Sequence, residues 1–243
     1  MAYILILGAR SDIARAVSHT FARNGFNLYL AARRHEELDP DQRDLTIRYG
    51  VMVETREFDV LATTGHGAFY NGLGEKPIGV VCAVGYLGDQ EKAERDPAEA
   101  RRILDTNFTG CVSILSIVAN DFEKRSEGFI IGISSAAGDR GKKSNYYYGS
   151  AKAGLTAFLS GLRNRLHPSG VRVITVKPGF VSTKMTEGMD LPRALTATPE
   201  EAADDIFRAW LKDRDVIYTK WYWKFIMLII RHIPEKIFRK LSL

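Results

Sequence analysis

The sequence predicts a single α/β domain built on a doubly wound parallel sheet. Three observations favour this class. Short apolar runs alternate with segments of helical apolar spacing along most of the chain, as expected when buried parallel strands are joined by helices. The first apolar run ends at a glycine that opens a helical segment. The chain has 243 residues, of which 45% are hydrophobic, and this is enough for one domain with a full core.

The first part of the chain supplies four strands and three helices. Residues 3–7 are apolar throughout and end before Gly8, which is typical of a buried parallel strand. The helix 12–24 carries apolar residues at helical spacing and stops at a glycine. The following elements are, in order, strand 27–32, short helix 39–48, strand 51–58, glycine-punctuated helix 63–72 and strand 78–84.

The second part of the chain continues the alternation. Its expected elements are the long helical region 97–124, strand 128–133, helix 146–166, strand 171–177, helix 199–211 and strand 216–219. Helix 146–166 ends before the pair His167-Pro168, where a proline interrupts the helical pattern. Strand–helix alternation predicts right-handed crossovers, and the ligands of such sheets bind beyond the carboxyl ends of the strands.

The excess positive charge of the chain is confined to its C-terminal end. The formal net charge is +5, yet 28 basic and 28 acidic residues precede Lys220. The last 24 residues hold six basic residues against Glu235, namely Lys220, Lys224, Arg231, Lys236, Arg239 and Lys240. A general nucleic-acid role therefore loses its support. We divide the chain into a catalytic domain, residues 1–219, and a basic amphipathic tail, residues 220–243.

The two cysteines indicate a reducing compartment. Cys82 lies in an apolar strand pattern and Cys111 in an apolar helix pattern, which favours buried free thiols. Neither has neighbours at metal-ligand spacing, so we predict no metal site. The N-terminal residues 1–8 indicate a first strand and not a signal peptide, so we expect a cytoplasmic protein.

The turn after the first strand is a candidate phosphate-binding turn. It contains Gly8, Arg10, Ser11, Asp12 and Ile13 at the start of the first helix. Small residues there let the backbone approach a pyrophosphate, and the helix N-terminus stabilises its charge. Only Gly8 of the usual glycine pattern is present, so a strand–helix turn without a ligand is an open alternative.

Basic residues stand at the end of the second strand, where an NAD site typically has an acid. The chain there contains Arg33 and Arg34, and no acid comes before Glu36. A guanidinium suits the 2′-phosphate of NADP, and Arg10 could reach the same phosphate. We therefore predict NADP(H) as the cofactor in preference to NAD(H). The alternative is that Arg33 and Arg34 are solvated loop charges.

Tyr148 and Lys152 form a candidate proton-delivery pair. Residues four apart share one face of a helix, so the ammonium can lie beside the phenol oxygen and favour its ionised form. Such a phenol can act as a general acid near neutral pH. Ser135 lies thirteen residues upstream of Tyr148. A tyrosine and a lysine at this spacing also occur by chance, so the surrounding motifs decide the assignment.

Seven motifs in order along the chain resemble those of the short-chain dehydrogenase/reductase superfamily, over roughly residues 1–220. They are the turn at Gly8, Phe58-Asp59-Val60, Cys82-Ala83-Val84-Gly85, Asp105-Thr106-Asn107-Phe108-Thr109-Gly110, Ile133-Ser134-Ser135-Ala136-Ala137-Gly138, Tyr148-x-x-x-Lys152 and Lys177-Pro178-Gly179-Phe180-Val181-Ser182-Thr183. The resemblance implies a Rossmann-like doubly wound parallel sheet. It also implies hydride transfer between a nicotinamide and a ketone or secondary alcohol.

The resemblance implies a role for each matching residue. Tyr148 would be the general acid/base, Ser135 would hydrogen-bond the substrate carbonyl oxygen, Lys152 would favour the phenolate and bind the nicotinamide ribose, and Asn107 would hold a relay water. The further implied cofactor contacts are Asp59 and Val60 at the adenine, Gly85 beside the fourth strand, Pro178 and Gly179 at the nicotinamide wall, and Val181 and Thr183 in the segment that follows.

Some features leave alternatives open. Tyr146 and Tyr147 have no lysine four residues later, so we expect them to pack or to line the cleft. Cys82 and Ala83 stand where the superfamily usually has asparagines, so the local hydrogen bonds must differ. The enzyme alternative is a soluble 3-oxoacyl or general carbonyl reductase. The other alternative is an NADP-binding sensor without turnover.

Two C-terminal segments bear on the substrate side. Residues 180–198, here called the lid segment, correspond to a mobile lid in the superfamily. The tail has an apolar core of about ten residues that includes Lys224, too short to span a bilayer. Its aromatic, aliphatic and basic residues suit an anionic membrane interface. A dimer arm buried against protein is the alternative.

The segment from Pro178 to Met185 and the ending from Arg231 to Lys240 are similar to one branch of the superfamily. This branch comprises decaprenyl-phosphoryl 2-keto-pentose reductases and related reductases of surface-polysaccharide clusters. The resemblance implies a keto-sugar substrate, lipid-linked in the sharper form, for a protein at the inner face of the membrane. We also predict a homo-oligomer, a dimer or a tetramer.

Overall fold

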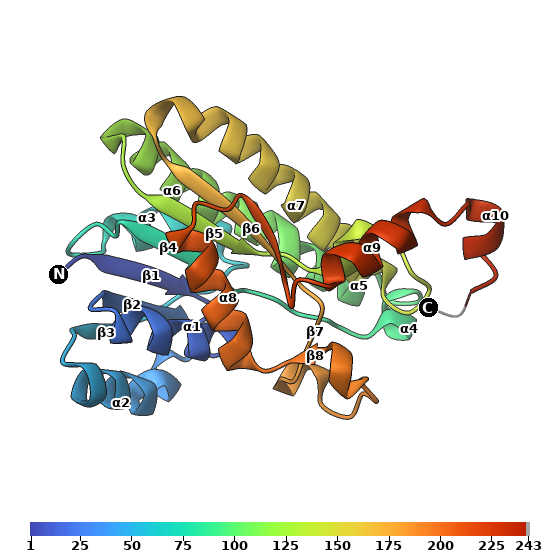
Figure 1. Cartoon of the computed structure of the whole chain (residues 1–243). Helices are drawn as coiled ribbons and strands as arrows, with labels where there is room; N and C mark the ends of the chain where they lie inside the picture. The colour runs from blue at the N-terminus through green and yellow to red at the C-terminus, as the bar shows by residue number, and fades with distance from the viewer. Residues whose placement is uncertain (242–243) are drawn as a thin grey trace.

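A seven-stranded parallel sheet forms the centre of the molecule (Figure 1). The computed structural model describes residues 1–241. The strand order is β3-β2-β1-β4-β5-β6-β9, and each neighbouring pair is parallel. The strands are β1 Tyr3–Leu7, β2 Asn27–Ala32, β3 Val53–Glu57, β4 Gly79–Cys82, β5 Phe129–Ile133, β6 Arg172–Pro178 and β9 Val216–Thr219. The predicted doubly wound parallel sheet is confirmed.

Helices cover both faces of this sheet (Figure 1). On one face lie α1 Asp12–Arg23, α2 Asp39–Tyr49 and α8 Pro199–Leu211. On the other lie α3 His66–Asn71, α6 Gly110–Arg125 and α7 Tyr146–Leu166. The short helices α4 Gln90–Ala93 and α5 Pro97–Leu104 follow β4. The sequence did not predict α4 as a separate element.

The core has two layers because successive side chains of a strand point to opposite faces of the sheet. Leu5 packs in the layer that contains Ile114 of α6. Ile6 packs in the opposite layer with Val17 of α1 and Ile206 of α8. Each of these five side chains is 0% exposed. Burial on both faces explains why the central strands β1, β4 and β5 are continuously apolar and do not alternate.

The predicted helical region 97–124 contains an irregular turn. α5 and α6 are joined without a break by the π turn Asp105–Thr109. Asn107 Nδ2 donates to the Ile103 carbonyl over 2.8 Å, an oxygen that accepts from the backbone N–H of residue 107 in a regular α-helix. The stretch Pro97–Arg125 is long and apolar enough to cross a membrane, but its most apolar window is 50% buried. Its packing in the core identifies it as an internal helix.

The prediction that both cysteines are buried free thiols is confirmed. Cys82 and Cys111 are free, and they are 1% and 0% exposed. Their sulfur atoms lie 3.7 Å apart between β4 and α6.

The chain after β6 forms two further structures at the carboxyl ends of the strands. Within the lid segment, β7 Phe180–Val181 pairs with β8 Thr196–Ala197. In the tail, α9 Trp223–His232 and the single turn α10 Glu235–Phe238 extend beyond the sheet (Figure 1). Trp223 and Met227 of α9 are buried against the rest of the chain. One face of the tail is therefore part of the folded domain.

Candidate active site

The four predicted catalytic residues lie on three elements that meet at the carboxyl ends of the central strands. Ser135 follows β5, and Asn107 lies in the π turn between α5 and α6. Tyr148 and Lys152 lie in the first two turns of α7. The fold brings these segments together at the edge where ligands of parallel sheets bind.

Lys152 is a buried ammonium without an acidic partner among residues 1–241. Its side chain is 2% exposed, and Nζ donates to the Ile133 carbonyl over 3.0 Å and to the Val84 carbonyl over 3.4 Å. Nζ also lies 5.7 Å from the centroid of the Tyr148 ring. The two carbonyls orient the charge without neutralising it. The positive charge therefore remains available to stabilise a nearby phenolate.

Asn107 and Gly85 lie beside this ammonium. Asn107 is 0% exposed, its Nδ2 donates to the Tyr86 carbonyl over 2.6 Å, and its Oδ1 accepts from the Tyr86 N–H over 3.1 Å. A Cβ on Gly85 would lie 3.5 Å from Asn107 Oδ1 and 3.7 Å from Lys152 Nζ. Asn107 thus fixes the backbone after β4, and Gly85 keeps the space between the amide and the ammonium open.

Ser134 and Ser135 have different surroundings. Ser134 is buried, and its hydroxyl donates to the Lys152 carbonyl over 2.8 Å. Ser135 begins the 3₁₀ turn Ala136–Asp139, and its Oγ accepts from the Ala137 N–H over 3.1 Å. That oxygen keeps its own proton to donate. The choice of Ser135 as the substrate-facing serine therefore agrees with the geometry.

Gly138 lets the serine turn pack directly on α7. A Cβ on Gly138 would lie 2.7 Å from the Ala153 nitrogen and 2.8 Å from the Lys152 carbonyl carbon. A side chain here would separate the serine turn from the helix that carries Tyr148 and Lys152. The close approach holds Ser135 in register with them.

Tyr148 differs from the two tyrosines before it. Its side chain is half-buried, and its hydroxyl has no hydrogen-bond partner within residues 1–241. Tyr146 is 38% exposed and its ring packs 4.9 Å from that of Tyr147. The Tyr147 N–H donates to Gln90 Oε1 over 3.3 Å. Tyr148 alone of the three combines a lysine on its own helix face with an uncommitted hydroxyl.

The predicted phosphate-binding turn is built on Gly8. Its φ of +79° favours glycine, and a Cβ there would lie 2.9 Å from the Val84 nitrogen. Ser11 caps α1 by accepting from the Ala14 N–H, and Ile13 packs partly buried on the core. Asp12 Oδ2 accepts from the Lys184 N–H over 2.7 Å, so this carboxylate holds the lid segment to the turn.

Only one of the three arginines near the end of β2 lacks an acidic partner. Arg10 and Arg34 both form ion pairs with Glu37, Arg34 over 2.9 Å. Arg33 is exposed and has no ion pair in the described part of the chain. Its guanidinium is the one that remains available to an anionic ligand.

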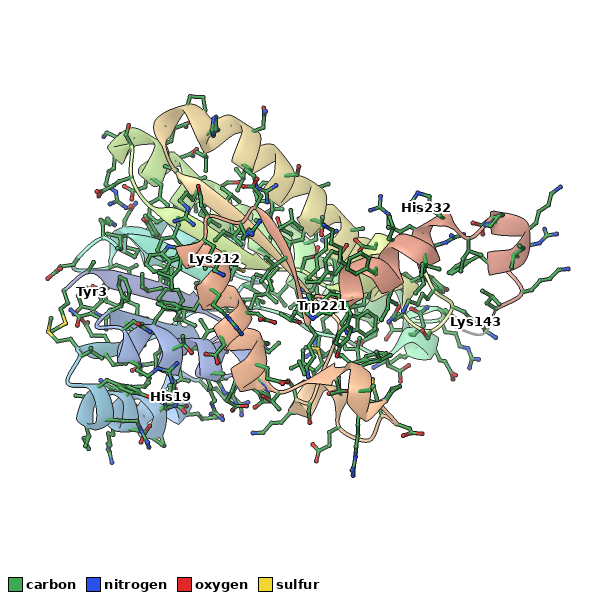
Figure 2. The ribbon with its side chains drawn as sticks, viewed as in Figure 1. Tyr3, His19, Lys143, Lys212, Trp221 and His232 are labelled. Atoms are coloured by element: carbon green, nitrogen blue, oxygen red, sulfur yellow. The ribbon has the colours of Figure 1, made fainter. Side chains whose placement is uncertain are left out.

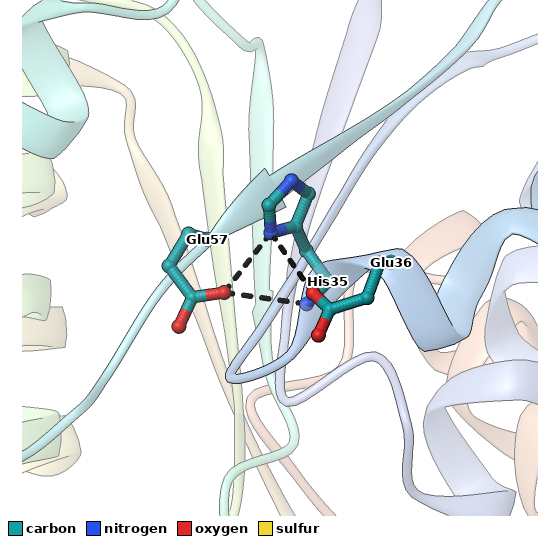
Figure 3. Close-up of side chains that lie close together, drawn as sticks. All are labelled: His35, Glu36 and Glu57. Carbon is teal, nitrogen blue, oxygen red and sulfur yellow. Dashed lines mark hydrogen bonds and ion pairs between the residues drawn. The ribbon is translucent and has the colours of Figure 1, made fainter.

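Figure 3 shows how the turn after these arginines is held. His35 Nδ1 lies 3.0 Å from Glu57 Oε2 and 3.6 Å from Glu36 Oε2, and the His35 N–H also donates to Glu57. The hydrogen bond from His35 lowers the pKa of the Glu57 carboxyl below its usual value. The three residues lie close enough for a metal ion, but their mutual contacts already account for the cluster. They tie the turn after β2 to the end of β3.

The other predicted adenine-side residues follow β3. Asp59 is half-buried, and its Oδ1 accepts from the Leu61 N–H over 3.0 Å. Val60 is 7% exposed, and a Cβ on Gly110 would lie 2.2 Å from its carbonyl oxygen. The segment after β3 therefore packs closely on the start of α6.

The predicted nicotinamide wall borders the lid segment. Pro178 ends β6, Val181 is 4% exposed in β7, and the Thr183 N–H donates to Thr186 Oγ1 over 3.1 Å. A Cβ on Gly85 would lie 3.5 Å from Met185 Cε. The lid segment therefore reaches the residues that surround Lys152.

Sequence reasoning missed Asp139, which joins three segments beneath the site. Lys177 Nζ pairs with Asp139 Oδ1 over 2.5 Å, and the two side chains are 9% and 4% exposed. Tyr218 donates to Asp139 Oδ2 over 2.5 Å, and burial together with this carboxylate raises the pKa of Tyr218. The signal was present, because Asp139 directly follows the serine motif and Lys177 precedes Pro178. Their pairing depends on the tertiary fold.

Sequence reasoning also missed the contact of the tail with this site. The Trp223 ring lies against Gly179, since a Cβ there would lie 2.0 Å from Trp223 Cε2. Arg140, next to Asp139, donates to the Ile230 and Ile233 carbonyls of the tail over 2.7 Å and 2.6 Å. No pattern in the tail indicates which of its aromatic residues turns inward.

Comparisons with known proteins agree with this geometry. The family model described as short chain dehydrogenase matches residues 2–193. An uncharacterized oxidoreductase of Mycobacterium tuberculosis strain H37Rv is 37% identical over 241 residues, which cover 98% of this chain and 96% of the relative. That alignment extends through the tail.

Two solved structures have the same fold. A short-chain dehydrogenase from Sphingobium yanoikuyae in complex with NADPH is 22% identical, with a TM-score of 0.83 and coverage of 97% of both chains. A short chain dehydrogenase from Burkholderia cenocepacia J2315 in complex with NADP is 18% identical, with a TM-score of 0.81 and coverage of 100% of this chain and 98% of the other.

Proposed function

This chain belongs to the short-chain dehydrogenase family, and on that premise we propose that it is an NADP(H)-dependent reductase of a carbonyl substrate. One observation carries the proposal. Tyr148, whose hydroxyl has no hydrogen-bond partner among residues 1–241, lies on α7 together with Lys152, a buried ammonium without an acidic partner there. Ser135 directly follows β5. This set of groups can deliver a proton to a carbonyl oxygen and stabilise the charge that develops on it.

The residues around the strand ends fit a dinucleotide. Gly8 lets the turn after β1 pack closely on the backbone of Val84 after β4, and α1 begins four residues later with its first N–H groups toward this turn. Gly85 keeps open space beside Lys152. Arg33 offers an unpaired guanidinium at the end of β2, where a 2′-phosphate would lie. NADP(H) in the two solved neighbours supports the same choice.

The chain's own residues perform the proton chemistry. Ser135 donates a hydrogen bond to the substrate carbonyl oxygen, and Tyr148 transfers its phenol proton to that oxygen as it gains charge. Lys152 stabilises the phenolate that remains. Asn107 supports the site by fixing the backbone at Tyr86, and one lone pair of its Oδ1 is left for a water. When bound, NADPH would supply the hydride, and a ketone would become a secondary alcohol.

Replacing Tyr148 tests this function. Tyr148→Phe removes only the proton, so we expect turnover to fall at least about 100-fold. NADPH consumption is to be measured with keto-sugars, lipid-linked ones included, with simple ketones and with 3-oxoacyl thioesters. Calorimetry should give nearly the same affinity for NADPH as in the unmodified chain.

Tyr147→Phe is the matched control, because it removes the same atom from the adjacent residue. We expect its turnover to stay within about twofold of the unmodified chain. Persistent activity in Tyr148→Phe would overturn the assignment of the acid. NADPH binding without turnover of any carbonyl in the screen would favour the sensor alternative.

For the substrate we propose a keto-sugar and, more specifically, a lipid-linked one. The support is the similarity of the chain after Pro178, and of its ending, to the branch of keto-pentose reductases. The same screen decides between this class and the alternative, a soluble 3-oxoacyl or general carbonyl reductase. Preference for a lipid-linked keto-sugar would support the branch assignment. Preference for thioesters would replace it.

We further propose that the protein works in the cytoplasm with its tail on the inner face of the membrane. Trp221, Phe225, Leu228 and Ile229 are 73%, 53%, 53% and 68% exposed. The spacing of Phe225, Leu228 and Ile229 places them on one face of α9, opposite Met227, and the ring of Trp221 packs 5.8 Å from that of Phe225. Figure 2 labels Trp221 just before this helix and His232 at its end. The tail also carries five exposed basic residues, namely Lys224, Arg231, Lys236, Arg239 and Lys240.

Such a face suits the interface of an anionic bilayer, where apolar side chains enter and basic ones meet the headgroups. In the alternative, the tail is a dimer arm and a second copy of this chain covers the same face. A homo-oligomer, a dimer or a tetramer, remains a prediction that light scattering of the full chain would test.

A further inference from the structure

The first turn of the tail helix lies against the residues that border the substrate side of the site. Trp223 is 4% exposed, and a Cβ on Gly179 would lie 2.0 Å from its Nε1. The Trp223 ring also meets the Phe180 ring edge-on, with 5.1 Å between centroids and 88° between planes. The indole therefore covers the chain just after β6, where the lid segment begins.

The same turn bonds the far end of the lid segment. Trp223 Nε1 donates to the Leu195 carbonyl over 3.0 Å, and the Tyr222 hydroxyl donates to the Ala194 carbonyl over 2.5 Å. Ala194 and Leu195 belong to the 3₁₀ turn Arg193–Leu195, just before β8. Two adjacent side chains of the tail thus hold two adjacent carbonyls of the lid segment.

The other end of α9 is anchored to the segment that carries Ser135. Met227 is 0% exposed and packs with Ala136, the residue after Ser135. Arg140 donates to the Ile230 and Ile233 carbonyls at the end of α9. Its guanidinium also lies 3.7 Å from the centroid of the Phe238 ring. α9 therefore spans from the serine turn to the lid segment.

We propose that Tyr222 and Trp223 are positioning residues that clamp the lid segment over the substrate side of the active site. α9 is then a part of the active site, and the inner face of this helix sets the position of residues 193–197. Arg140 and Met227 hold the clamp relative to Ser135. Only the identification of this site as an active site rests on the proposed function, because the clamp itself consists of contacts within the chain.

Limited digestion of the full chain with trypsin tests the clamp. Within residues 180–198 trypsin can cut after Lys184 and Arg193, and the second bond is next to the clamped Ala194 carbonyl. Tyr222→Phe and Trp223→Phe each remove one donor and keep an aromatic ring. We expect each to speed cleavage after Arg193 about fivefold, the change that loss of one hydrogen bond of typical net strength produces.

Trp221→Phe is the matched control. Trp221 precedes the clamp, is 73% exposed, and contacts only the rings of Tyr222 and Phe225 among the ring pairs of residues 1–241. We expect its digestion rate to equal that of the unmodified chain. Amide exchange of residues 193–198 should rise in the two clamp variants, while exchange in β5 and α7 stays close to that of the unmodified chain. The melting temperature of Tyr222→Phe should also stay close, whereas Trp223→Phe loses part of a buried ring as well and should melt lower.

Unchanged cleavage after Arg193 in the double variant Tyr222→Phe/Trp223→Phe would overturn the clamp. Equal acceleration by Trp221→Phe, or a rise of exchange throughout the molecule, would also overturn it, because both indicate general loosening. None of these measurements needs turnover or a bound cofactor. Calorimetry with NADPH on the same samples tests the proposed function separately, so failure of one inference is distinguishable from failure of the other.

Discussion

At the residue scale, spacing predicts the candidate site residues, and contacts within the structure separate neighbours of the same type. Ser134 and Ser135 are adjacent, and the distance to Tyr148 favoured Ser135. The structure adds a reason, since Ser134 is committed to the Lys152 carbonyl. We assign Arg33 to the 2′-phosphate, but no spacing in the sequence separates it from Arg34 in the same way. Their difference depends on Glu37, whose carboxylate pairs with Arg34 and Arg10 but not with Arg33.

Arg33→Ala should weaken NADPH binding selectively. A charge-assisted hydrogen bond contributes about 1.5–3 kcal/mol, so we expect a loss of roughly 10- to 100-fold in affinity for NADPH. NADH lacks the 2′-phosphate, and its affinity should stay within about twofold. Calorimetric titration with both cofactors measures this difference.

Arg34→Ala is the control for local charge, because Glu37 already pairs with that guanidinium. We expect it to weaken NADPH less than Arg33→Ala does. If Arg33→Ala weakened NADPH and NADH equally, the 2′-phosphate assignment would fail.

At the scale of elements, most strands were predictable as short apolar runs, and the long helices mainly from apolar residues at helical spacing. Other elements depend on contacts between distant residues. The π turn at Asp105–Thr109 forms where the Asn107 side chain bonds Ile103 and Tyr86. β7 and β8 have two residues each, which is too short for any period. The inner face of α9 was not predicted, because its partners Ala136 and Gly179 lie far away in the sequence.

The start of α8 offers a test at this scale. Thr198 Oγ1 accepts from the Glu201 N–H over 3.2 Å, and Glu201 Oε2 accepts from the Thr198 N–H over 2.9 Å. Thr198→Ala removes the Oγ1 half of this reciprocal cap and should lower the free energy of unfolding by about 1 kcal/mol. Urea denaturation measures the loss.

The same cap predicts a dependence on pH. The hydrogen bond from the Thr198 N–H and the contact with Lys220 lower the pKa of Glu201 below 4.5. A carboxyl with a lowered pKa in the folded state contributes stability above its ordinary pKa and loses it as the pH falls. Glu201→Gln should therefore be less stable than the unmodified chain at neutral pH, and the difference should shrink as the pH falls below about 4.5. If the difference in the free energy of unfolding stayed constant at low pH, the Glu201 carboxylate would not contribute to the cap through its charge.

At the scale of the whole molecule, the net excess of positive charge lies in the tail. The chain before Lys220 has balanced charge, while the tail combines basic residues with the exposed apolar face of α9. The inner face of that helix is fixed by Trp223 and Met227, so the outer face is presented in one orientation. Flotation with vesicles tests whether this face binds an anionic bilayer.

We expect the full chain to float with vesicles containing phosphatidylglycerol and to stay in solution with pure phosphatidylcholine. The triple variant Trp221→Ser/Phe225→Ser/Ile229→Ser should lose flotation. Ile47→Ser/Leu211→Ser is the matched control, since these apolar side chains are 85% and 62% exposed on helices outside the tail. Equal flotation of the triple variant would exclude the α9 face as the contact. A fall in mass by light scattering in the triple variant would point to the dimer arm instead.

The two ends of the molecule differ in a way that matters for handling the protein. Met1 lies next to β1, at the amino ends of the strands, whereas α9 and α10 lie beyond their carboxyl ends (Figure 1). An affinity tag or fluorescent fusion at the N-terminus would therefore project from the side remote from Ser135, Tyr148 and the clamp. The same fusion after α10 would lie beyond α9, next to the proposed bilayer contact (Figure 1). Purification and labelling should use the amino end.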